Sequence, residues 1–320
     1  MTRKLVSVLL SAFALLLLMG ASAPLEQPDT LLAEEESAVF LSAALETEAY
    51  VHLEEAVEGA VQATASANPL EVAESTDNKL LIDGVPAPIE VGRVQKDGVT
   101  YVALAPMAQA LNPSAQVAWD GSTATVTTPA LRLTAKVGQL YLEANGRYLY
   151  LPEGVQLSGG RVIVPLWAVA EAFGATVGWN AAAGTVTVTR GSGAIQPGDS
   201  YYNQEDLFWL SRVIYAESGN QSLEGKMAVG NVVLNRVANP IYPNTIQGVL
   251  AQKNQFSTYK SGALAYRTPT ESCIIAAKLV LDGGVVEETE GALYFDSARN
   301  SWASRNRTYV TTLGGHKFYR

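Results

Sequence analysis

Cysteine and histidine are scarce in this chain of 320 residues, and their scarcity argues against several classes of protein. The single cysteine, Cys273, cannot form a disulfide within the chain, which disfavours a small disulfide-stabilised scaffold. The two histidines, His52 and His316, lie far apart in the sequence. Zinc hydrolases hold their metal with two or three clustered imidazoles or thiolates, so neither a zinc amidase nor a zinc endopeptidase is expected. We predict no metal site and no cofactor.

Positively charged residues are absent from Leu5 to Asn78. The same stretch is rich in Glu and Asp, and the net charge of the whole chain is −9. We interpret residues 24–78 as an acidic, alanine-rich spacer, disordered or partly helical, which repulsion between like charges keeps extended. Segments such as Leu45–Val61 favour helix. No basic patch appears beyond the spacer, so nucleic acid is not an expected partner.

Long hydrophobic runs are also rare, and residues 5–19 form the only long one. Arg3 and Lys4 precede this run, and a small-x-small sequence, Ala-Ser-Ala at 21–23, follows it. This order predicts a secretory signal peptide over residues 1–23. The alternative, an uncleaved membrane anchor, is disfavoured because the run is shorter than the ~20 residues needed to span a bilayer. We therefore expect an exported protein with no stable membrane anchor after cleavage.

Residues 79–190 contain an internal repeat. Each copy is predicted to form a short strand, a short helix and a two-stranded hairpin. Glycine follows Asp120 in the first hairpin and Ala183 in the second, as hairpin turns favour, and further strands are expected over Leu131–Leu151 around an Asn145-Gly146 turn. The matching segments are 98–102, 107–111, 117–120 and 124–127 in the first copy, and 160–164, 169–173, 177–180 and 185–188 in the second.

The repeat resembles the copper amine oxidase N-terminal-like domain, a stalk module of exported bacterial proteins. Despite the family name no copper is expected, because a copper site needs clustered imidazoles and residues 79–190 contain no histidine. Trp119 and Trp179 occupy equivalent positions in the two copies. Both could stack on sugars, but we favour the interpretation that each anchors the small core of its own copy.

Residues 191–200 have the Gly, Ser and Pro content of a linker, across which few contacts are expected. Beyond this linker, residues 201–320 are predicted to form a separate, mostly helical domain. Its first helix is expected over Gln204–Glu217, with Asn203 as N-cap.

Three further helices are predicted in this domain. One begins after Ser222 and ends before Pro240, and a short one follows the Pro243-Asn244 pair. Another begins at Thr268-Pro269-Thr270-Glu271, which is read as an N-cap, a proline at N1 and a capping-box glutamate. Gly283-Gly284 should end it.

Glu217 is the candidate catalytic residue of the first helix. Leu210, Ile214 and Glu217 fall at positions i, i+4 and i+7, so they share one face, and this face should point to the core. Burial and the negative end of the helix both disfavour a charged carboxylate, which raises the pKa as a general acid requires. The alternative is a structural carboxylate paired with Arg212 or Arg236, and spacing alone leaves both interpretations open.

The C-terminal domain resembles the cell wall hydrolase SleB/CwlJ family, with motifs in the family's order over nearly all of 206–320. The series begins at 215–219, Tyr-Ala-Glu-Ser-Gly. The resemblance implies a lysozyme-like fold and makes Glu217 the catalytic residue. Ser218 departs from the pattern, because many members carry Arg there, and the spacing from Phe256 to the Gly291 motif is short. The other motifs are 224–225, 228–229, 233–237, 242–245, 248–249, 255–257, 291–295 and 314–319.

This resemblance predicts a peptidoglycan lytic transglycosylase that cleaves the glycan strand after muramic acid, in spore cortex or vegetative wall. One carboxyl group is enough, because the sugar's own 6-hydroxyl closes a 1,6-anhydro ring, whereas ordinary glycosidases need a pair. Glu224 is the best second carboxylate, although the helix dipole explains a glutamate in the first turn of a helix. The candidate substrate-binding residues are Asn235, Gln255, Phe256, Tyr294 and His316.

Several alternatives stay open. The domain could be a hydrolytic muramidase with the same acid, or a wall-binding protein whose hydrolase domain is inactive. A Cys–His peptidase using Cys273 and His316 is disfavoured, because a cysteine within a capped helix is usually a small core residue. Asn231 and Asn235 share a stripe with Glu224, which suits either sugar hydroxyls or a buried network. Phe256 and Tyr294 could belong to the core.

The predicted fold class is α+β with two domains, a duplicated α+β stalk module over 79–190 and a mainly α, lysozyme-like catalytic domain over 201–320. Residues 201–320 are expected to carry the chemistry, with peptidoglycan glycan strands as the partner. Residues 79–190 are expected to space the enzyme or attach it to wall or spore coat. The expected location is the cell wall, the spore cortex or envelope, or the extracellular medium.

Overall fold

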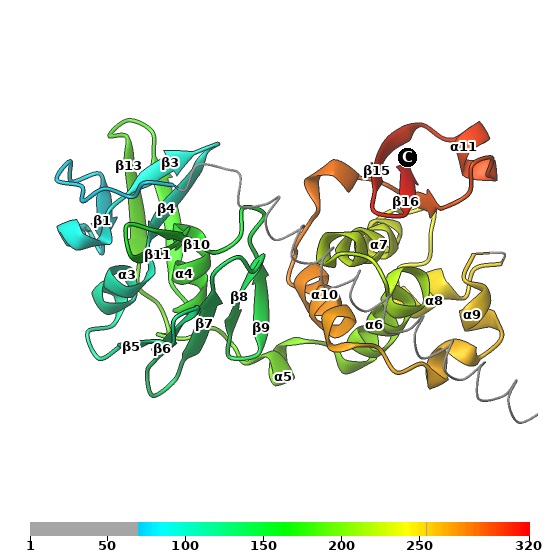
Figure 1. Ribbon diagram of the computed structural model, residues 1–320, viewed down its shortest axis with the longest axis horizontal. Helices are drawn as coiled ribbons and strands as arrows, with labels where there is room; N and C mark the ends of the chain where they lie inside the picture. The colour runs from blue at the N-terminus through cyan, green and yellow to red at the C-terminus, as the bar shows by residue number, and fades with distance from the viewer. Residues whose placement is uncertain (1–69, 254) are drawn as a thin grey trace, which may run out of the picture. The chain divides into compact units, whose positions relative to one another are not determined.

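The computed structural model describes residues 70–253 and 255–320 (Figure 1). The predicted signal peptide, 1–23, lies outside the described residues, and so does the predicted spacer up to residue 69. The described residues all fall within one compact unit. None of the helices in this part of the chain is long and apolar enough to cross a membrane.

The N-terminal module, residues 79–190, consists of short strands and two helices, α3 (Leu104–Leu111) and α4 (Leu166–Ala172). The strands are β1 (Leu80–Ile82), β2 (Val85–Pro86), β3 (Val94–Lys96), β4 (Val99–Ala103), β5 (Gln116–Trp119), β6 (Thr123–Thr127), β7 (Arg132–Lys136), β8 (Tyr141–Ala144), β9 (Arg147–Tyr150), β10 (Gln156–Ser158), β11 (Arg161–Pro165), β12 (Thr176–Asn180) and β13 (Thr185–Thr189). They form three sheets with the orders β12-β13-β1-β2, β10-β11-β4-β3 and β5-β6-β7-β8-β9.

Both copies of the sequence repeat fold into the predicted succession of strand, helix and hairpin, β4-α3-β5-β6 and β11-α4-β12-β13. In β6 and β13 buried residues alternate with outward threonines, as a half-buried strand requires. The strands β4 and β11 pair antiparallel, with Val102 opposite Val164, and side chains of both copies share one hydrophobic core. Asn145 and Gly146 have positive φ values of 51° and 78°, which confirms the predicted turn between β8 and β9.

Residues 70–78, which the sequence assigns to the spacer, pack on the module. Val72 is buried against Tyr101 and Ile163. The Arg161 guanidinium donates to the Val72 carbonyl oxygen, and the backbone N–H of Leu70 donates to the side chain of Gln156. The folded module therefore includes residues 70–78, because the side chain of Val72 adds to its core.

The prediction that Trp119 and Trp179 anchor the cores of the two copies is wrong. Their side chains are 48% and 58% exposed. Both lie on strands, β5 and β12, that form the outer edges of their sheets, while the neighbouring strands supply buried residues such as Val126 and Val186. The repeat therefore presents two large aromatic side chains at its surface.

The C-terminal domain, residues 201–320, combines helices with a small sheet, so it is more mixed than the predicted mainly helical fold. Its helices are α6 (Gln204–Ser218), α7 (Leu223–Ala238), α8 (Ile246–Leu250), α9 (Ser257–Lys260), α10 (Glu271–Leu281) and α11 (Trp302–Asn306), with 3-10 turns at Ala263–Tyr266 and Glu287–Thr289. The sheet has the order β14-β16-β15, formed by β14 (Tyr294–Asp296), β15 (Tyr309–Leu313) and β16 (His316–Tyr319).

The caps of the first two helices in this domain are as predicted. The Asn203 side chain accepts from two backbone N–H groups of α6, and the Ser222 hydroxyl accepts from Gly225 at the start of α7. The start of α10 differs from the prediction, because Thr270 rather than Thr268 is the N-cap residue. Its hydroxyl lies near Ser272 and Cys273 instead of capping the backbone.

Contacts cross the predicted linker, contrary to the expectation of few. Ile195 within it belongs to the core of the N-terminal module, and the short helix α5 (Gly198–Tyr201) begins with a bond from the Gly198 N–H to the Asn145 carbonyl oxygen. Strand β9 contacts α10, and Tyr150 is buried in the hydrophobic core of the C-terminal domain. A linker-like composition indicates irregular chain, but it does not prevent packing between the domains that it joins.

Candidate functional site

Glu217 lies at the edge of the buried face of α6. Leu210, Ile214 and Ser218, spaced four residues apart, are completely buried and form the centre of that face. Glu217 precedes Ser218 and is half-buried, so its carboxyl borders the core and retains some access to solvent. The Glu217 side chain therefore lies on the inward side of α6, as predicted, but at the edge of the buried face rather than at its centre.

Burial raises the pKa of Glu217 above its ordinary value. The arginines that could have paired with it are engaged elsewhere: Arg212 stacks on Phe208 and donates to its carbonyl oxygen, and Arg236 donates to Leu293 and Gln255. None of the ion pairs in residues 70–253 and 255–320 includes Glu217. The interpretation of Glu217 as a structural partner of an arginine is thus contradicted.

The raised pKa of Glu217 makes the stability of the protein depend on pH in a known direction. A carboxyl of this kind binds its proton more tightly in the folded state. The stability that this proton contributes to the folded state is therefore fully present at pH values below 4.5, the ordinary pKa of the group. It is lost as pH rises through the pKa of the folded state. We expect the free energy of unfolding of Glu217→Gln, relative to the parent, to increase as pH rises above 4.5.

Urea denaturation of both proteins at several pH values between about 4 and about 8 measures this difference. Glu205→Gln, which removes an exposed carboxyl from the first turn of the same helix, is the matched control. We compare the difference in free energy of unfolding between each variant and the parent. If this difference grows with pH no more for Glu217→Gln than for Glu205→Gln, the raised pKa of Glu217 is contradicted.

Ser218, the departure from the family pattern, is completely buried. Its hydroxyl donates to the Ile214 carbonyl oxygen at 2.8 Å, one turn back in the same helix. The hydroxyl is therefore satisfied within α6 and contributes no charge beside Glu217. Ser218→Ala should change stability by only ~1 kcal/mol.

A turn of the small sheet approaches the end of α6. The backbone N–H of Gly315, between β15 and β16, donates to the side chain of Gln221 at 2.7 Å, and Gln221 lies in the connection that follows Glu217. His316, the next residue, is half-buried and packs edge-on against Phe295 at 5.3 Å between ring centroids. Burial lowers its pKa, and its buried Nδ1 has no hydrogen-bond partner among the described residues.

Tyr294 belongs to a group of aromatic and arginine side chains. Its hydroxyl is hydrogen bonded to that of Tyr242 at 2.8 Å and accepts from Arg307 at 3.1 Å. The Arg307 guanidinium lies 4.6 Å from the Trp302 ring centroid, and Trp302 is 53% exposed. Such a surface offers both stacking and charge to a ligand. Tyr242 belongs to the family motif at 242–245, whereas the sequence analysis gave no signal for Trp302 or Arg307.

The other candidate binding residues have structural contacts. Asn235 donates its amide N–H to the Ala292 carbonyl oxygen, and Phe256 is buried in the hydrophobic core. The exposed Gln255 accepts from Arg236. Asn231 donates to Gly284 and accepts from Val286, so this amide belongs to a buried network. Among these candidates, Phe256 is buried, Asn235, Tyr294 and His316 are half-buried, and Gln255 is exposed.

Glu224 and Cys273 are both occupied. Glu224 accepts a hydrogen bond from Tyr150, a residue of the N-terminal module, at 2.9 Å. Burial, followed by the nearby Glu224 carboxylate, raises the pKa of Tyr150, so its hydroxyl keeps the proton that it donates. Cys273 is completely buried in the core of the C-terminal domain. In the part of the chain that the structure describes, no three His, Cys, Asp or Glu side chains gather as metal ligands would.

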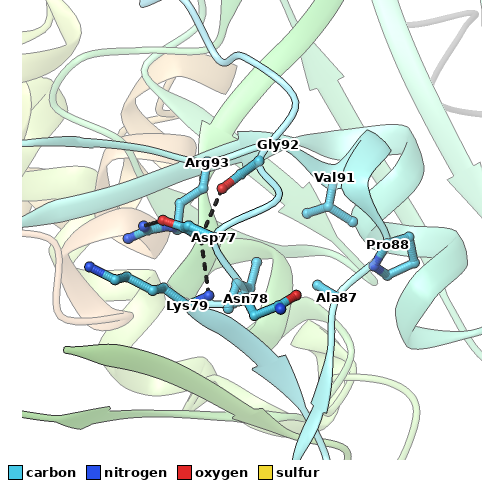
Figure 2. Close-up of a pocket in the computed structure, with 10 residues that line it drawn as sticks. Asp77, Asn78, Lys79, Ala87, Pro88, Val91, Gly92 and Arg93 are labelled. Carbon is cyan, nitrogen blue, oxygen red and sulfur yellow. Dashed lines mark hydrogen bonds and ion pairs between the residues drawn. The ribbon is translucent and has the colours of Figure 1, made fainter. Parts of the chain in front are cut away.

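A small pocket lined by residues from 75–80 and 87–93 does not compete with this site. Asp77, Lys79 and Arg93 border it, and Figure 2 shows the Asp77 carboxylate beside Arg93. Asp77 pairs with the Arg93 guanidinium and accepts from the Lys79 backbone N–H. The pocket holds about 10 Å³, roughly the space that one water molecule needs. Its charged groups therefore serve the packing of residues 70–79.

Comparisons with known proteins agree with the two domains. A family described as Cell Wall Hydrolase matches residues 220–319, and the copper amine oxidase N-terminal domain matches residues 81–188. Glu217 lies just before the first of these ranges. The spore cortex-lytic enzyme of Bacillus cereus is 34% identical over 121 residues, which cover 37% of this chain and 45% of that protein.

The spore cortex-lytic enzyme of Bacillus subtilis is 28% identical over 120 residues, 37% of this chain and 38% of that protein. This chain thus spans less than half the length of these two relatives. One similar solved structure is the catalytic domain of the germination-specific lytic transglycosylase SleB from Bacillus anthracis, which is 30% identical in sequence. The match covers 37% of this chain and 97% of the solved chain, with a TM-score of 0.34.

The chain therefore carries a cell wall hydrolase domain that follows a copper amine oxidase N-terminal-type domain. Its C-terminal domain is similar to part of the spore cortex-lytic enzymes. Both resemblances noted in the sequence are confirmed.

Proposed function

We propose that this protein is a peptidoglycan lytic transglycosylase with Glu217 as its single catalytic carboxyl. The observation that carries the proposal is a half-buried glutamate with a raised pKa that pairs with no arginine among the described residues and lies just before the range matched by the cell wall hydrolase family. A raised pKa keeps more of the carboxyl protonated at a given pH, which suits a general acid that protonates a leaving oxygen. The spore cortex-lytic names of the relatives support peptidoglycan as the substrate.

The proposed reaction needs no second carboxylate. Glu217 gives its proton to the glycosidic oxygen as the bond between that oxygen and C1 of muramic acid breaks. The resulting carboxylate takes the proton of the 6-hydroxyl of the same sugar, and O6 bonds to C1 to close the 1,6-anhydro ring. Glu217 ends protonated, and no water is consumed. Tyr294 and His316 are proposed to contact the sugar, because both are partly accessible in the same domain.

A hydrolytic muramidase with the same acid would require a second carboxylate to activate water. Glu224 is already bonded to Tyr150. Asp296 is the better candidate, because one of its oxygens contacts Ser301 while the other is buried without a partner among the described residues. If the muramidase reading is correct, Asp296→Asn should abolish cleavage as Glu217→Gln does. The transglycosylase reading predicts that Asp296→Asn remains active.

Mass spectrometry of the fragments released from purified peptidoglycan tests the proposal. A transglycosylase leaves 1,6-anhydromuramic ends, which are lighter by one water than the reducing ends left by a muramidase. A folded protein that releases no fragments would instead be a wall-binding protein with an inactive hydrolase domain. We further propose that the protein acts outside the cytoplasm, at cortex or wall, where the N-terminal module spaces or attaches the catalytic domain.

A further inference from the structure

The N-terminal module contains a hollow of about 510 Å³ beside the exposed Trp179. Strand β12 contributes Trp179 and Val177, and the first turn of α4 contributes Trp167. The two tryptophans are 58% and 37% exposed. The hollow has the size of a small-molecule site, and such sites combine apolar walls with a few polar groups. Gln95 and Thr100, on β3 and β4, supply the polar groups.

Both tryptophans of this hollow come from the second copy of the repeat, whereas Gly98, Val99 and Thr100 come from the first. In the first copy the residue equivalent to Trp167 is Ala105, at the same place in the first turn of the helix. Trp119 therefore stands without a second indole beside it, although it is exposed to a similar extent as Trp179. The first copy forms the same succession of strand, helix and hairpin with Ala105 at this place, so the fold does not require a second exposed tryptophan. The pair in the second copy thus points to a ligand.

The lining of the hollow defines the chemistry of that ligand. It contains no ionisable side chain, so it offers no ion-pair partner to a phosphate or a carboxylate. Indole faces carry partial negative charge and attract the weakly positive C–H groups of a flat apolar surface. Pyranose rings present such C–H faces, while their hydroxyl and acetamido groups can bond to Gln95 and Thr100. A neutral N-acetylhexosamine chain satisfies the tryptophans and the polar groups together.

We propose that the hollow formed by Trp167 and Trp179 is a glycan-binding site that holds the N-acetylhexosamine backbone of the cell-wall strand. The inference rests on the proposed function for the identity of the polymer, because the hydrolase domain acts on the same kind of strand. A second site on the same chain raises the effective concentration of substrate at the catalytic domain without changing the chemistry. The site is thus an attachment point, separate from the reacting bond.

Binding of the full chain to purified, insoluble peptidoglycan tests this site. All proteins in this assay carry Glu217→Gln, so that digestion does not release them. Trp167→Ala with Trp179→Ala should weaken binding by about tenfold, as the loss of two aromatic contacts predicts. Trp119→Ala, the matched control, removes an exposed tryptophan from the other copy and should leave binding within about twofold. Titration with neutral N-acetylglucosamine oligomers should likewise show weaker binding by the double variant than by Trp119→Ala.

The outcomes separate this inference from the proposed function. Unchanged binding by the double variant would overturn the glycan site, even if Glu217→Gln abolishes cleavage. Loss of binding in the double variant while Glu217→Gln still cleaves would uphold the site and reject the catalytic assignment. If the double variant instead loses self-association in sedimentation experiments and keeps glycan binding, the hollow holds a second copy of the chain and the inference is wrong. Thermal unfolding verifies that each variant is folded.

Discussion

Glu217→Gln should lower the rate of glycan cleavage by a factor of about 10²–10⁴, which is the usual contribution of a general acid. Glutamine has nearly the shape of glutamate but no proton to give to the leaving oxygen. The half-buried site already disfavours the charged carboxylate, so the neutral amide should be accepted without unfolding. The measurement is the initial rate of release of soluble fragments from purified peptidoglycan.

The control for this experiment is Glu205→Gln, which removes an exposed carboxyl from the same helix. Its rate should stay within about twofold of the parent, since surface substitutions of this kind have small effects. A folded Glu217→Gln protein that keeps more than about a hundredth of the parent rate would show that Glu217 is not the general acid.

Arg147→Ala should destabilise the protein by about 3–5 kcal/mol, the usual cost of breaking a buried ion pair from one side. Arg147 begins β9, and its Nε donates to Asp282 at the end of α10 at 2.9 Å. The two side chains are 8% and 1% exposed. Removing the guanidinium leaves the Asp282 carboxylate buried, with the Tyr202 hydroxyl as its one side-chain donor among residues 70–253 and 255–320.

Other contacts make this interface between the domains continuous. Lys278, one turn before Asp282, donates to the Gly146 carbonyl oxygen and lies 5.0 Å from the Tyr148 ring centroid. Tyr150 packs into the same hydrophobic core as α10. A chain cut to 201–320 would expose this surface to water, so we expect the fragment to unfold at a lower temperature than the full chain.

Two variants make the Arg147 result specific. Arg132→Ala removes an exposed arginine from β7 of the same module and should change the free energy of unfolding by less than about 0.5 kcal/mol. Arg147→Met combined with Asp282→Leu replaces both charges and should recover most of the lost stability, because the buried charge disappears with its partner. If urea denaturation gives the same small value for Arg147→Ala and Arg132→Ala, the interface is not closed in solution.

Features that depend on a few neighbouring residues were predictable from the sequence. The Asn203 and Ser222 caps were identified because the capping side chain and the backbone group that it serves lie within one turn. The Asn145-Gly146 turn was identified for the same reason, since both residues accept a positive φ. The direction of Glu217 followed from the period of the helix, although its carboxyl lies at the margin of the buried face.

Features that depend on distant parts of the chain were not predictable in this way. Arg147 and Asp282 are 135 positions apart, and nothing in either neighbourhood indicates the other. The exposure of Trp179 depends on which strand lies at the edge of its sheet, and that order is set by the pairing of β13 with β1. Pairing of this kind decides which of two equally apolar strands is covered, so the interpretation of the tryptophans as core residues failed.

The central claim is that one carboxyl, Glu217, carries out an intramolecular cleavage of the glycan strand. The most direct test is mass spectrometry of fragments released from the same peptidoglycan by the parent and by Glu217→Gln. We predict 1,6-anhydromuramic ends from the parent and no fragments above background from the variant. Reducing muramic ends from the parent, or anhydro ends from the folded variant at a comparable rate, would contradict the claim.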